Sequence, residues 1–204
     1  MLVQQNPQNS IIMKYTICLI YGSVRFERKG IKAANYMRSK LEEMGYLVHF
    51  IDPREYQLPF LDKMYKEFPQ GSAPEVMEEI AEKLRSSDGF IIVTGEYNHS
   101  IPPALKNLLD HFQQEYYFKP SAIVSYSGGY FGGVRAAVQL RAILAELGMS
   151  SIPSVLPVPF VQDAFDKDDQ PVNDIINRSA KRFLNEFEWY LEALKLQREK
   201  GTPH

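Results

Sequence analysis

The stretch "GFIIVTGEYNHSIPPALKNLLDHF", residues 89–112, decides the fold. It opens with a continuous apolar run at 90–93, which is typical of a β-strand buried on both faces of a sheet. A polar and aromatic segment at 95–100 follows, and after two prolines the leucines recur at helical spacing. A strand, a polar loop and an amphipathic helix in this order predict a β-α unit.

The same alternation continues along the rest of the chain. Apolar runs rich in β-branched and aromatic residues occur at 15–21, 46–51, 89–94, 121–127 and 150–158. Helical patterns follow these runs and begin at Ile31, Val76, Leu105, Val134 and Ile176. Strands that alternate with helices indicate a parallel sheet with right-handed crossovers. We therefore predict the α/β class: a flavodoxin-like three-layer sandwich with a five-stranded parallel sheet of order 2-1-3-4-5 and helices on both faces.

Local signals mark the ends of the helices. Gly45 and Gly148 follow two of the helical patterns and predict their ends. Residues 72–75, Ser-Ala-Pro-Glu, form a predicted capping box with proline in the first turn of a helix. The irregular segment 52–71 is long for a loop, and such length usually indicates function or mobility.

Size and composition describe an ordinary globular protein. The chain has 204 residues, of which 45% are hydrophobic and 24% charged, enough for one domain with a substantial core. A net charge of −2 favours neither nucleic acid nor an anionic membrane as a partner. We predict a disordered polar tail over 1–12, a single domain over 13–198 and a short tail over 199–204.

The only cysteine, Cys18, lies inside an apolar run. No intramolecular disulfide can form, which fits a reducing compartment, and apolar burial favours a core residue over a nucleophile. The first twelve residues have no basic region and no long apolar run, so we expect no signal peptide or membrane span and a cytoplasmic location. The histidines lack the spacing of metal ligands, and we expect no metal site.

The loop after the first strand, "GSVRFERKG" at 22–30, suits a phosphate. In an open parallel sheet, ligands bind beyond the carboxyl ends of the strands. Gly22 permits a tight turn, Ser23 offers a hydroxyl, and the next helix presents its positive end. Arg25 and Arg28 add charge. The loop matches neither a P-loop nor a dinucleotide fingerprint, and the alternative is a glycine turn with solvated arginines.

The loop after the third strand has a different character. We expect Ser100 to cap the following helix and Pro102 or Pro103 to lie in its first turn. The prolines are expected to hold the preceding residues in a fixed, extended path. Tyr97 and His99 offer faces against which a planar heterocycle could pack. The alternative is a helix cap with incidental aromatic residues.

The loop after the fourth strand, "SYSGGYFGGVRAA" at 125–137, contains four glycines in six positions. These glycines let the backbone approach a ligand closely, or they simply permit a turn. A phosphate site at one loop and a flat ring between the other two describe a mononucleotide, and a flavin fits this arrangement best.

The three loops together carry a family resemblance. "GSVRFERKG", "GEYNHSIPPALKNLLDH" and "SGGYFGGVRAAVQLRAILAELG" resemble, in order and spacing, the NADPH-dependent FMN reductases, which include quinone, azo-dye and chromate reductases. The second motif is the most specific, and its matching positions are Glu96, Tyr97, Asn98, Ser100, Pro102, Leu105, Lys106, Asn107 and Asp110. Two positions depart from the family: Gly95 replaces a usual proline, and Arg28 replaces a common serine.

The resemblance implies FMN as cofactor and NADPH or NADH as reductant. The first loop would hold the phosphate, the second would line the isoalloxazine largely through backbone groups, and the third would close over its pyrimidine side. The expected cofactor-binding residues are Gly22, Ser23, Arg25, Arg28, Glu96, Tyr97, Asn98, His99, Ser127, Gly128 and Gly129. The family has no invariant side-chain acid or base, so no catalytic side chain is expected, because the flavin supplies the chemistry.

The resemblance predicts an enzyme that passes electrons from NAD(P)H through FMN to a small-molecule acceptor: a quinone, an azo dye, a metal oxyanion or free flavin. One alternative is a flavodoxin-type electron carrier, although such carriers are usually strongly acidic and this chain is not. Another is an FMN-binding redox sensor without turnover.

Aromatic residues near the predicted site bear on assembly. They are Tyr116, Tyr117, Phe118, Tyr130 and Phe131. A monomer would expose some of them as an apolar patch, which usually marks an interface. The family commonly forms dimers or pairs of dimers, so we predict a homodimer, or a homotetramer in which Lys106 and Asp110 pair across subunits. The alternative is that these aromatics pack against 52–71 in the same chain.

Overall fold

The computed structural model describes residues 14–204, so Met13 and the predicted tail over 1–12 lie outside the described residues. Its five strands are β1 (Thr16–Tyr21), β2 (Leu47–Ile51), β3 (Gly89–Gly95), β4 (Pro120–Tyr126) and β5 (Ser150–Val158). All neighbouring strands are parallel, in the order β2-β1-β3-β4-β5. The predicted class and strand order are confirmed.

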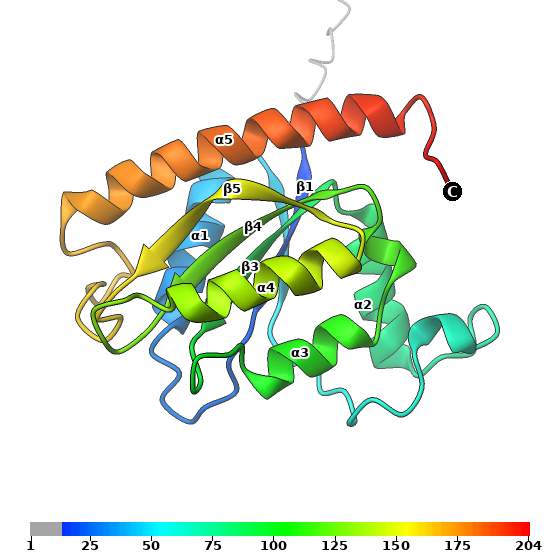
Figure 1. The fold of residues 1–204 in the computed structure, drawn as a ribbon, viewed down its shortest axis with the longest axis horizontal. Coiled ribbons are helices and arrows are strands. Elements are labelled where there is room, and N and C mark those ends of the chain that lie inside the picture. Colours follow the sequence, from blue (N-terminus) through cyan, green and yellow to red (C-terminus); the bar gives the residue numbers. More distant parts are fainter. Residues whose placement is uncertain (1–13) are drawn as a thin grey trace, which may run out of the picture.

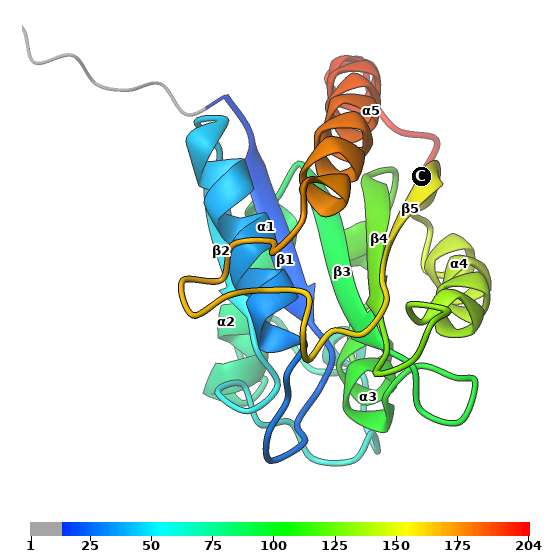
Figure 2. The ribbon, with the colours of Figure 1, turned by 90° about the vertical axis from the view of Figure 1, so that its left-hand side faces the viewer.

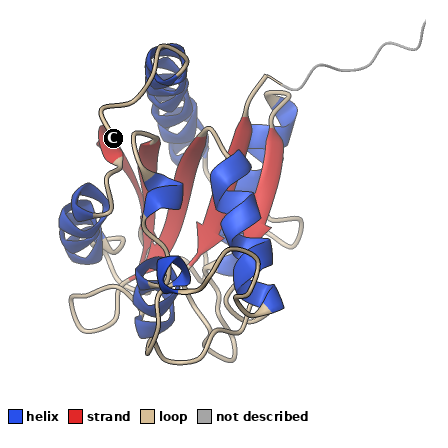
Figure 3. Cartoon of the chain, turned by 90° about the vertical axis from the view of Figure 1, so that its right-hand side faces the viewer, coloured by secondary structure: helices blue, strands red, loops and turns tan. Residues whose placement is uncertain are grey.

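Helices cover both faces of this sheet (Figures 2 and 3). They are α1 (Ile31–Glu43), α2 (Glu75–Ser86), α3 (Pro103–Asp110), α4 (Val134–Glu146) and α5 (Asp174–Arg198), with short 3-10 turns η1 (Tyr65–Glu67) and η2 (Gln114–Tyr116). One apolar cluster joins the sheet to α1 and α5, and a second joins it to α2, α3 and α4. The long α5 runs across the molecule beside the sheet (Figure 1).

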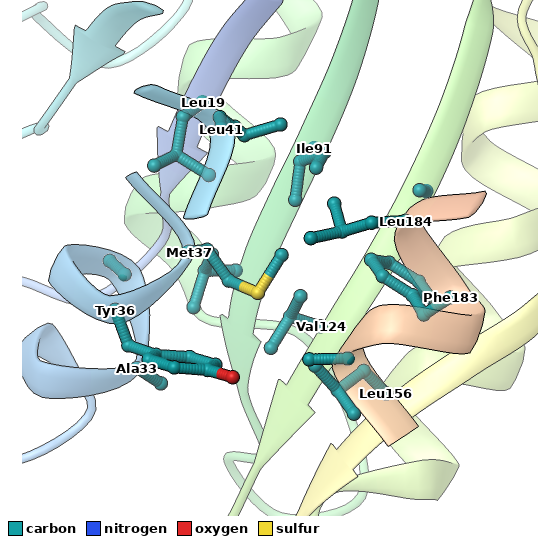
Figure 4. Packing of buried hydrophobic residues seen from close by; sticks show 14 of the residues in the cluster. Leu19, Ala33, Tyr36, Met37, Leu41, Ile91, Val124, Leu156, Phe183 and Leu184 are labelled. Atoms are coloured by element: carbon teal, nitrogen blue, oxygen red, sulfur yellow. The ribbon is translucent and has the colours of Figure 1, made fainter. Parts of the chain in front are cut away.

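The strand sequences explain these two cores. Alternate side chains of a strand point to opposite faces, so Leu19 and Tyr21 enter the first cluster while Cys18 and Ile20 enter the second. A strand covered on both sides therefore needs a continuous apolar run. On the α1/α5 side, Met37 of α1 and Phe183 of α5 pack over the same face of the sheet (Figure 4). Each large side chain buried in this way contributes about 1.5–3 kcal/mol.

The edge strands depart from the expectation of burial on both faces. Leu47 at the start of β2 is exposed, and β5 mixes exposed, half-buried and buried positions, of which only Ile152, Leu156 and Val158 are buried. A strand at the edge is only partly covered by the helices of each layer, so the prediction of complete burial is wrong for these two strands.

Two predicted helix ends are confirmed and one predicted start is wrong. Gly45 and Gly148 follow α1 and α4 with φ of 78° and 79°, the left-handed region that glycine adopts freely. The capping box at 72–75 does not form, because the Ser72 hydroxyl donates to the Pro69 carbonyl (2.7 Å). Instead, the Glu78 carboxylate accepts the Ala73 backbone N–H (3.2 Å) from one turn inside the helix.

The segment 52–71 lies against α3. The side-chain amide of Asn107 donates to the Pro59 carbonyl (2.7 Å), and its oxygen accepts the Leu61 backbone N–H (3.0 Å). The Tyr65 backbone N–H donates to the carbonyl of His111 at the end of α3 (2.8 Å). These bonds give the long loop a defined path.

The aromatic run after α3 belongs mostly to the fold. Tyr116 is completely buried, with its ring edge-on to Phe90 (5.3 Å between ring centres), so it is not one of the exposed aromatics of the predicted patch. The Phe118 ring lies 4.9 Å from that of His204, at the end of the chain. No helix within residues 14–204 has the length and apolar character needed to cross a membrane.

Candidate functional site

The loops that follow β1, β3 and β4 meet at the carboxyl end of the sheet, toward the bottom of Figure 2. Here they enclose an open cavity of about 320 Å³, within the range of small-ligand sites. Its lining residues are Ser23, Arg25, Glu27, Arg28, Lys29, Gly30, Gly95, Glu96, Tyr97, Tyr126, Ser127, Gly128, Val161 and Gln162.

Seven predicted site residues therefore lie together: Ser23, Arg25, Arg28, Glu96, Tyr97, Ser127 and Gly128. Four others do not line the cavity. Gly22 backs onto α3, since a Cβ there would meet the Leu105 side chain at 3.0 Å. Asn98 and His99 form the exposed tip of their loop, and Gly129 lies one residue beyond the lining turn.

The first and second loops are joined by hydroxyl groups. Ser23 is buried, and its Oγ lies 2.7 Å from the hydroxyl of Tyr97 in a hydrogen bond. The same Oγ accepts the Arg25 backbone N–H at the longer distance of 3.4 Å. The Arg25 guanidinium lies 6.0 Å from the centre of the Tyr97 ring. Among the described residues, Arg25 forms no ion pair, so its charge is available at the cavity.

Arg28 has a charged partner that the sequence did not reveal. Its guanidinium forms an ion pair and hydrogen bond with Asp52, directly after β2, whose carboxylate is 1% exposed. The guanidinium also lies 5.7 Å from the centre of the Tyr21 ring. Arg28 thus contacts both the cavity and the core.

Tyr126, at the end of β4, fills the space beneath the first two loops. A Cβ on Gly30 would lie 2.1 Å from its ring, and one on Gly95 would lie 3.0 Å away. Both positions therefore favour glycine, which accounts for Gly95 where the family usually has proline. The Tyr126 hydroxyl donates to that of Tyr21 (3.1 Å), which donates to the Arg28 carbonyl (3.2 Å).

Burial keeps both of these hydroxyls protonated. It raises the pKa of Tyr126 well above its usual value and raises the pKa of Tyr21 as well. Both groups therefore remain donors at neutral pH, and the chain of hydroxyls supports the first loop from below.

The loop between β3 and α3 is a tight turn rather than the predicted extended path. Tyr97 and Ser100 exchange two backbone hydrogen bonds (2.9 and 3.0 Å) around Asn98 and His99, whose φ angles are 50° and 68°. Two consecutive left-handed residues are typical of a type I′ turn, in which asparagine is favoured. The prolines fix only the residues immediately before α3, so the prediction overestimated their reach.

The start of α3 is also corrected. Pro102, in an extended conformation, is the residue before the first helical turn, and no side chain caps this end. The prediction that Ser100 caps the helix is therefore wrong, because Ser100 belongs to the turn. Pro103 occupies the first helical position as predicted, where its missing N–H has no cost.

Glu96 connects the second loop to α4. Its carboxylate accepts the backbone N–H of Arg135 (3.1 Å) in the first turn of the helix and pairs with the Arg135 guanidinium (3.3 Å). A negative charge is stabilised at the N-terminal end of a helix. The Arg135 guanidinium in turn lies 4.5 Å from the centre of the Phe131 ring. Glu96 therefore fixes two loops of the cavity relative to each other.

The glycine turn after β4 rests on residues that follow β5. Val161 N–H donates to the Ser127 carbonyl (3.1 Å), and the Gln162 side chain donates to the Gly128 carbonyl (3.4 Å). The sequence prediction missed Val161 and Gln162 as lining residues. A signal existed, because the carboxyl end of a fifth parallel strand must lie at the same edge of the sheet as the others.

The lining has the chemistry of a flavin mononucleotide site. The loop after β1 brings the cations Arg25, Arg28 and Lys29 and the N-terminal end of α1 to the lining, and these groups suit a phosphate ester. The rings of Tyr97 and Tyr126 and the backbone of Gly128 also line the cavity, and a Cβ on Gly128 would meet only the Gln162 side chain, at 3.6 Å. Within residues 14–204, no group of three or more histidine, cysteine, aspartate or glutamate side chains is placed to hold a metal ion.

Comparisons with known proteins agree with this chemistry. The profile of the family described as NADPH-dependent FMN reductase matches residues 15–163. A quinone reductase of Pseudomonas putida is 29% identical over 182 residues, which are 85% of this chain and 92% of that protein. An NAD(P)H-dependent FMN reductase of Pseudomonas aeruginosa is 30% identical over 128 residues, which are 60% of this chain and 69% of that protein.

A solved structure supports the fold. FerB of Paracoccus denitrificans, a flavoenzyme NAD(P)H:(acceptor) oxidoreductase, has a TM-score of 0.70 at 22% identity, covering 88% of this chain and 98% of its own. The residues that match the family include the loops after β1, β3 and β4. The chain therefore belongs to the NADPH-dependent FMN reductase family, and it is a flavodoxin-like oxidoreductase that uses FMN as cofactor and NAD(P)H as reductant.

Proposed function

We propose that the protein passes electrons from NAD(P)H through FMN, bound in the cavity at the carboxyl end of the sheet, to a small acceptor. A quinone is the first choice, and an azo dye, a metal oxyanion or free flavin are the other candidates. The observation that carries this proposal is the cavity itself, whose lining combines the cations Arg25 and Lys29 with the aromatic ring of Tyr97 and the backbone of Gly128.

The proposed roles follow from the contacts. Arg25 attracts the phosphate, because its charge has no carboxylate partner among residues 14–204. Ser23 offers a hydroxyl whose position is fixed by Tyr97. When bound, FMN supplies the redox chemistry, since its ring system takes hydride from a nicotinamide and passes electrons on.

The second and third loops would hold the flavin ring. The aromatic face of Tyr97 and the backbone of Ser127 and Gly128 are the groups available to it. Glu96 keeps the two loops at a fixed separation through Arg135, which also compensates its negative charge. The protein's contribution is to bind and orient the ring, and no side chain is proposed as a general acid or base.

The test uses purified protein. An absorption spectrum with flavin bands, and NADPH oxidation at steady state with menadione as acceptor, are expected. An electron carrier or a redox sensor would bind FMN without this turnover. We expect ping-pong kinetics, because nicotinamide and acceptor would use the same exposed flavin face in turn, and ternary-complex kinetics would contradict that expectation.

Assembly into a homodimer remains a prediction, and exposure changes the set of aromatic residues that supports it. Tyr130 and Phe131 of the predicted set are 76% and 57% exposed, and Phe26 and Phe60 join them at 92% and 89%. Phe26 belongs to a loop that lines the cavity, and Tyr130 and Phe131 flank the glycine turn after β4. Apolar side chains this exposed favour an interface. Lys106 pairs with Asp110 within α3, so a tetramer with that pair across subunits would have to exchange this bond.

Light scattering at low micromolar concentration tests the assembly. A homodimer is expected, and a mass of 23.5 kDa would contradict it. The cytoplasmic location and the domain limits at 13 and 198 also remain predictions.

A further inference from the structure

We propose that Asp52 is a positioning residue for phosphate binding: it holds Arg28 in place at the cavity and ties the 22–30 loop to the 53–61 segment. This inference rests on the proposed FMN site. Asp52 does not line the cavity, and it acts through Arg28.

Asp52 is built into the end of β2 as a buried anchor. One carboxylate oxygen accepts the Arg54 backbone N–H (3.0 Å), and the other pairs with the Arg28 guanidinium. Its backbone carbonyl accepts the N–H groups of Glu55 and Tyr56, both at 2.9 Å. A buried carboxylate is costly unless it is paired and hydrogen-bonded, so Arg28 is required where it is.

Arg28 is held from several directions. Its φ of 21° is unusual for a residue other than glycine, so the surrounding contacts must maintain it. Its carbonyl accepts the Tyr21 hydroxyl (3.2 Å) and the Ile31 backbone N–H (2.9 Å). Asp52 binds one nitrogen of the guanidinium group, Nη1. The remaining N–H groups of this planar group therefore keep a fixed direction at the cavity.

The charges of the loop separate the roles of the two arginines. Lys29 pairs with Glu27 (3.3 Å) and Arg28 pairs with Asp52, which leaves Arg25 as the cation of the 22–30 loop that has no carboxylate partner among the described residues. Arg25 therefore supplies net charge, and Arg28 supplies oriented donors.

This division gives an unusual expectation for Asp52→Asn. On charge alone, removing a carboxylate beside a phosphate site strengthens the binding of an anion. Positioning predicts the opposite, because Arg28 without its partner loses its fixed direction. The sign of the change therefore distinguishes the two accounts.

The 53–61 segment should share the effect. This segment follows Asp52 directly. Together with Val24 and the start of α3, it lines a neighbouring apolar cavity of about 530 Å³. Asn107 secures its far end through Pro59 and Leu61. Asp52 secures the near end. FMN binding at the first loop should therefore slow hydrogen exchange in this segment through the Arg28–Asp52 pair.

The experiment measures dissociation constants of flavin-free protein for FMN and for riboflavin, by quenching of flavin fluorescence. For Asp52→Asn, we expect FMN binding to weaken about tenfold or more, with riboflavin binding changed less than about twofold. Glu55→Gln is the matched control, because it removes one negative charge near Asp52 from an exposed residue that does not line the cavity, without releasing Arg28. It should leave FMN binding equal or tighter.

A second variant tests the same ion pair in case Asp52→Asn does not fold. Arg28→Lys keeps the positive charge and Asp52 but replaces the planar guanidinium group by an ammonium group. It should also weaken FMN binding more than riboflavin binding. In the double variant Arg28→Lys/Asp52→Asn, FMN binding should fall little further than in Arg28→Lys alone. Hydrogen exchange should show FMN protecting residues 53–58 in the wild type and less so in Asp52→Asn.

The outcomes separate the two levels of the proposal. If the wild type does not prefer FMN to riboflavin, the proposed FMN function fails. If it does prefer FMN, but Asp52→Asn binds FMN as well as or better than the wild type, the positioning role is overturned. Additive effects of the two substitutions would overturn it as well.

Discussion

The two ends of the sheet use similar charges for different purposes. At the amino end, Asp88 precedes β3 and accepts the Thr16 backbone N–H (3.0 Å), while Lys195 and Arg198 of α5 pair with it. At the carboxyl end, Asp52 pairs with Arg28 beside a cavity. The amino-end groups bind one another and the backbone, whereas Arg28 also faces space that a ligand can enter.

Lys119, directly before β4, is a charge at the amino end that is satisfied by the backbone. Its ammonium group donates to the carbonyl oxygens of Leu84, Arg85 and Glu115 at 2.8 to 3.0 Å. Burial lowers its pKa to about 8. Charge in a fold therefore indicates a ligand site only where it borders a cavity, and the residue type alone does not reveal this.

Breaking the amino end should have the largest effect, and only on stability. Asp88→Ala leaves Lys195 and Arg198 without their carboxylate and removes the bond to β1. We expect a loss of about 3 kcal/mol in the free energy of unfolding, measured by urea denaturation. The ratio of FMN to riboflavin affinity should stay unchanged. A loss below about 1 kcal/mol would mean that this cluster is a solvated surface group.

Removing the free charge at the carboxyl end should have the next largest effect. Arg25→Ala is expected to weaken FMN binding by about 1.5–3 kcal/mol, the range for hydrogen bonds to charged groups. Riboflavin affinity and unfolding free energy should hardly change, because Arg25 has no ion-pair partner within residues 14–204. Titration with both flavins measures this, and equal losses for the two would place Arg25 away from the phosphate.

The glycine turn offers a matched pair of substitutions. Gly128→Val places bulk in the cavity, so both flavins should bind more weakly, by about 1–3 kcal/mol, without loss of stability. Gly129→Val is the control, since a Cβ there meets nothing within 4 Å and the residue does not line the cavity. Flavin content of the purified variants is the measurement. Equal content in both would show that the turn does not touch the ring.

The smallest effect is expected from the buried hydroxyl chain. Tyr126→Phe keeps the ring beneath Gly30 but removes the hydrogen bond to Tyr21, at a cost of about 1 kcal/mol in stability. Because burial raises the pKa of both tyrosines, their contribution is complete below pH 10 and is lost at higher pH, where the unfolded chain ionises first. Urea unfolding of the wild type and of Tyr126→Phe between pH 8 and 11 measures this, and an identical pH dependence of the two proteins above pH 10 would contradict it.

Much of this architecture follows from the sequence. The strand ends differ from prediction by at most one residue, because continuous apolar runs between helices are a strong local signal. Gly45 and Gly148 mark helix ends for an equally local reason, the left-handed conformation that glycine adopts easily. The strand order follows from the β-α repetition.

The errors concern interactions between distant segments. Whether Ser100 caps a helix or pairs with Tyr97 depends on the turn between them, which the prolines do not determine. The Arg28–Asp52 pair joins two loops that meet only when β1 and β2 lie side by side. Tyr126 read as an ordinary strand residue, and only the packed structure shows that its ring fixes the identity of Gly30.

The most direct test of the central claim is a titration of the flavin-free protein with FMN, followed by fluorescence. The account predicts saturation at one FMN per chain, with an affinity at least tenfold higher than for riboflavin, because charged contacts to the phosphate contribute about 1.5–3 kcal/mol. Absence of quenching, or equal affinity for the two flavins, would contradict a phosphate-anchored FMN site at the carboxyl end of the sheet.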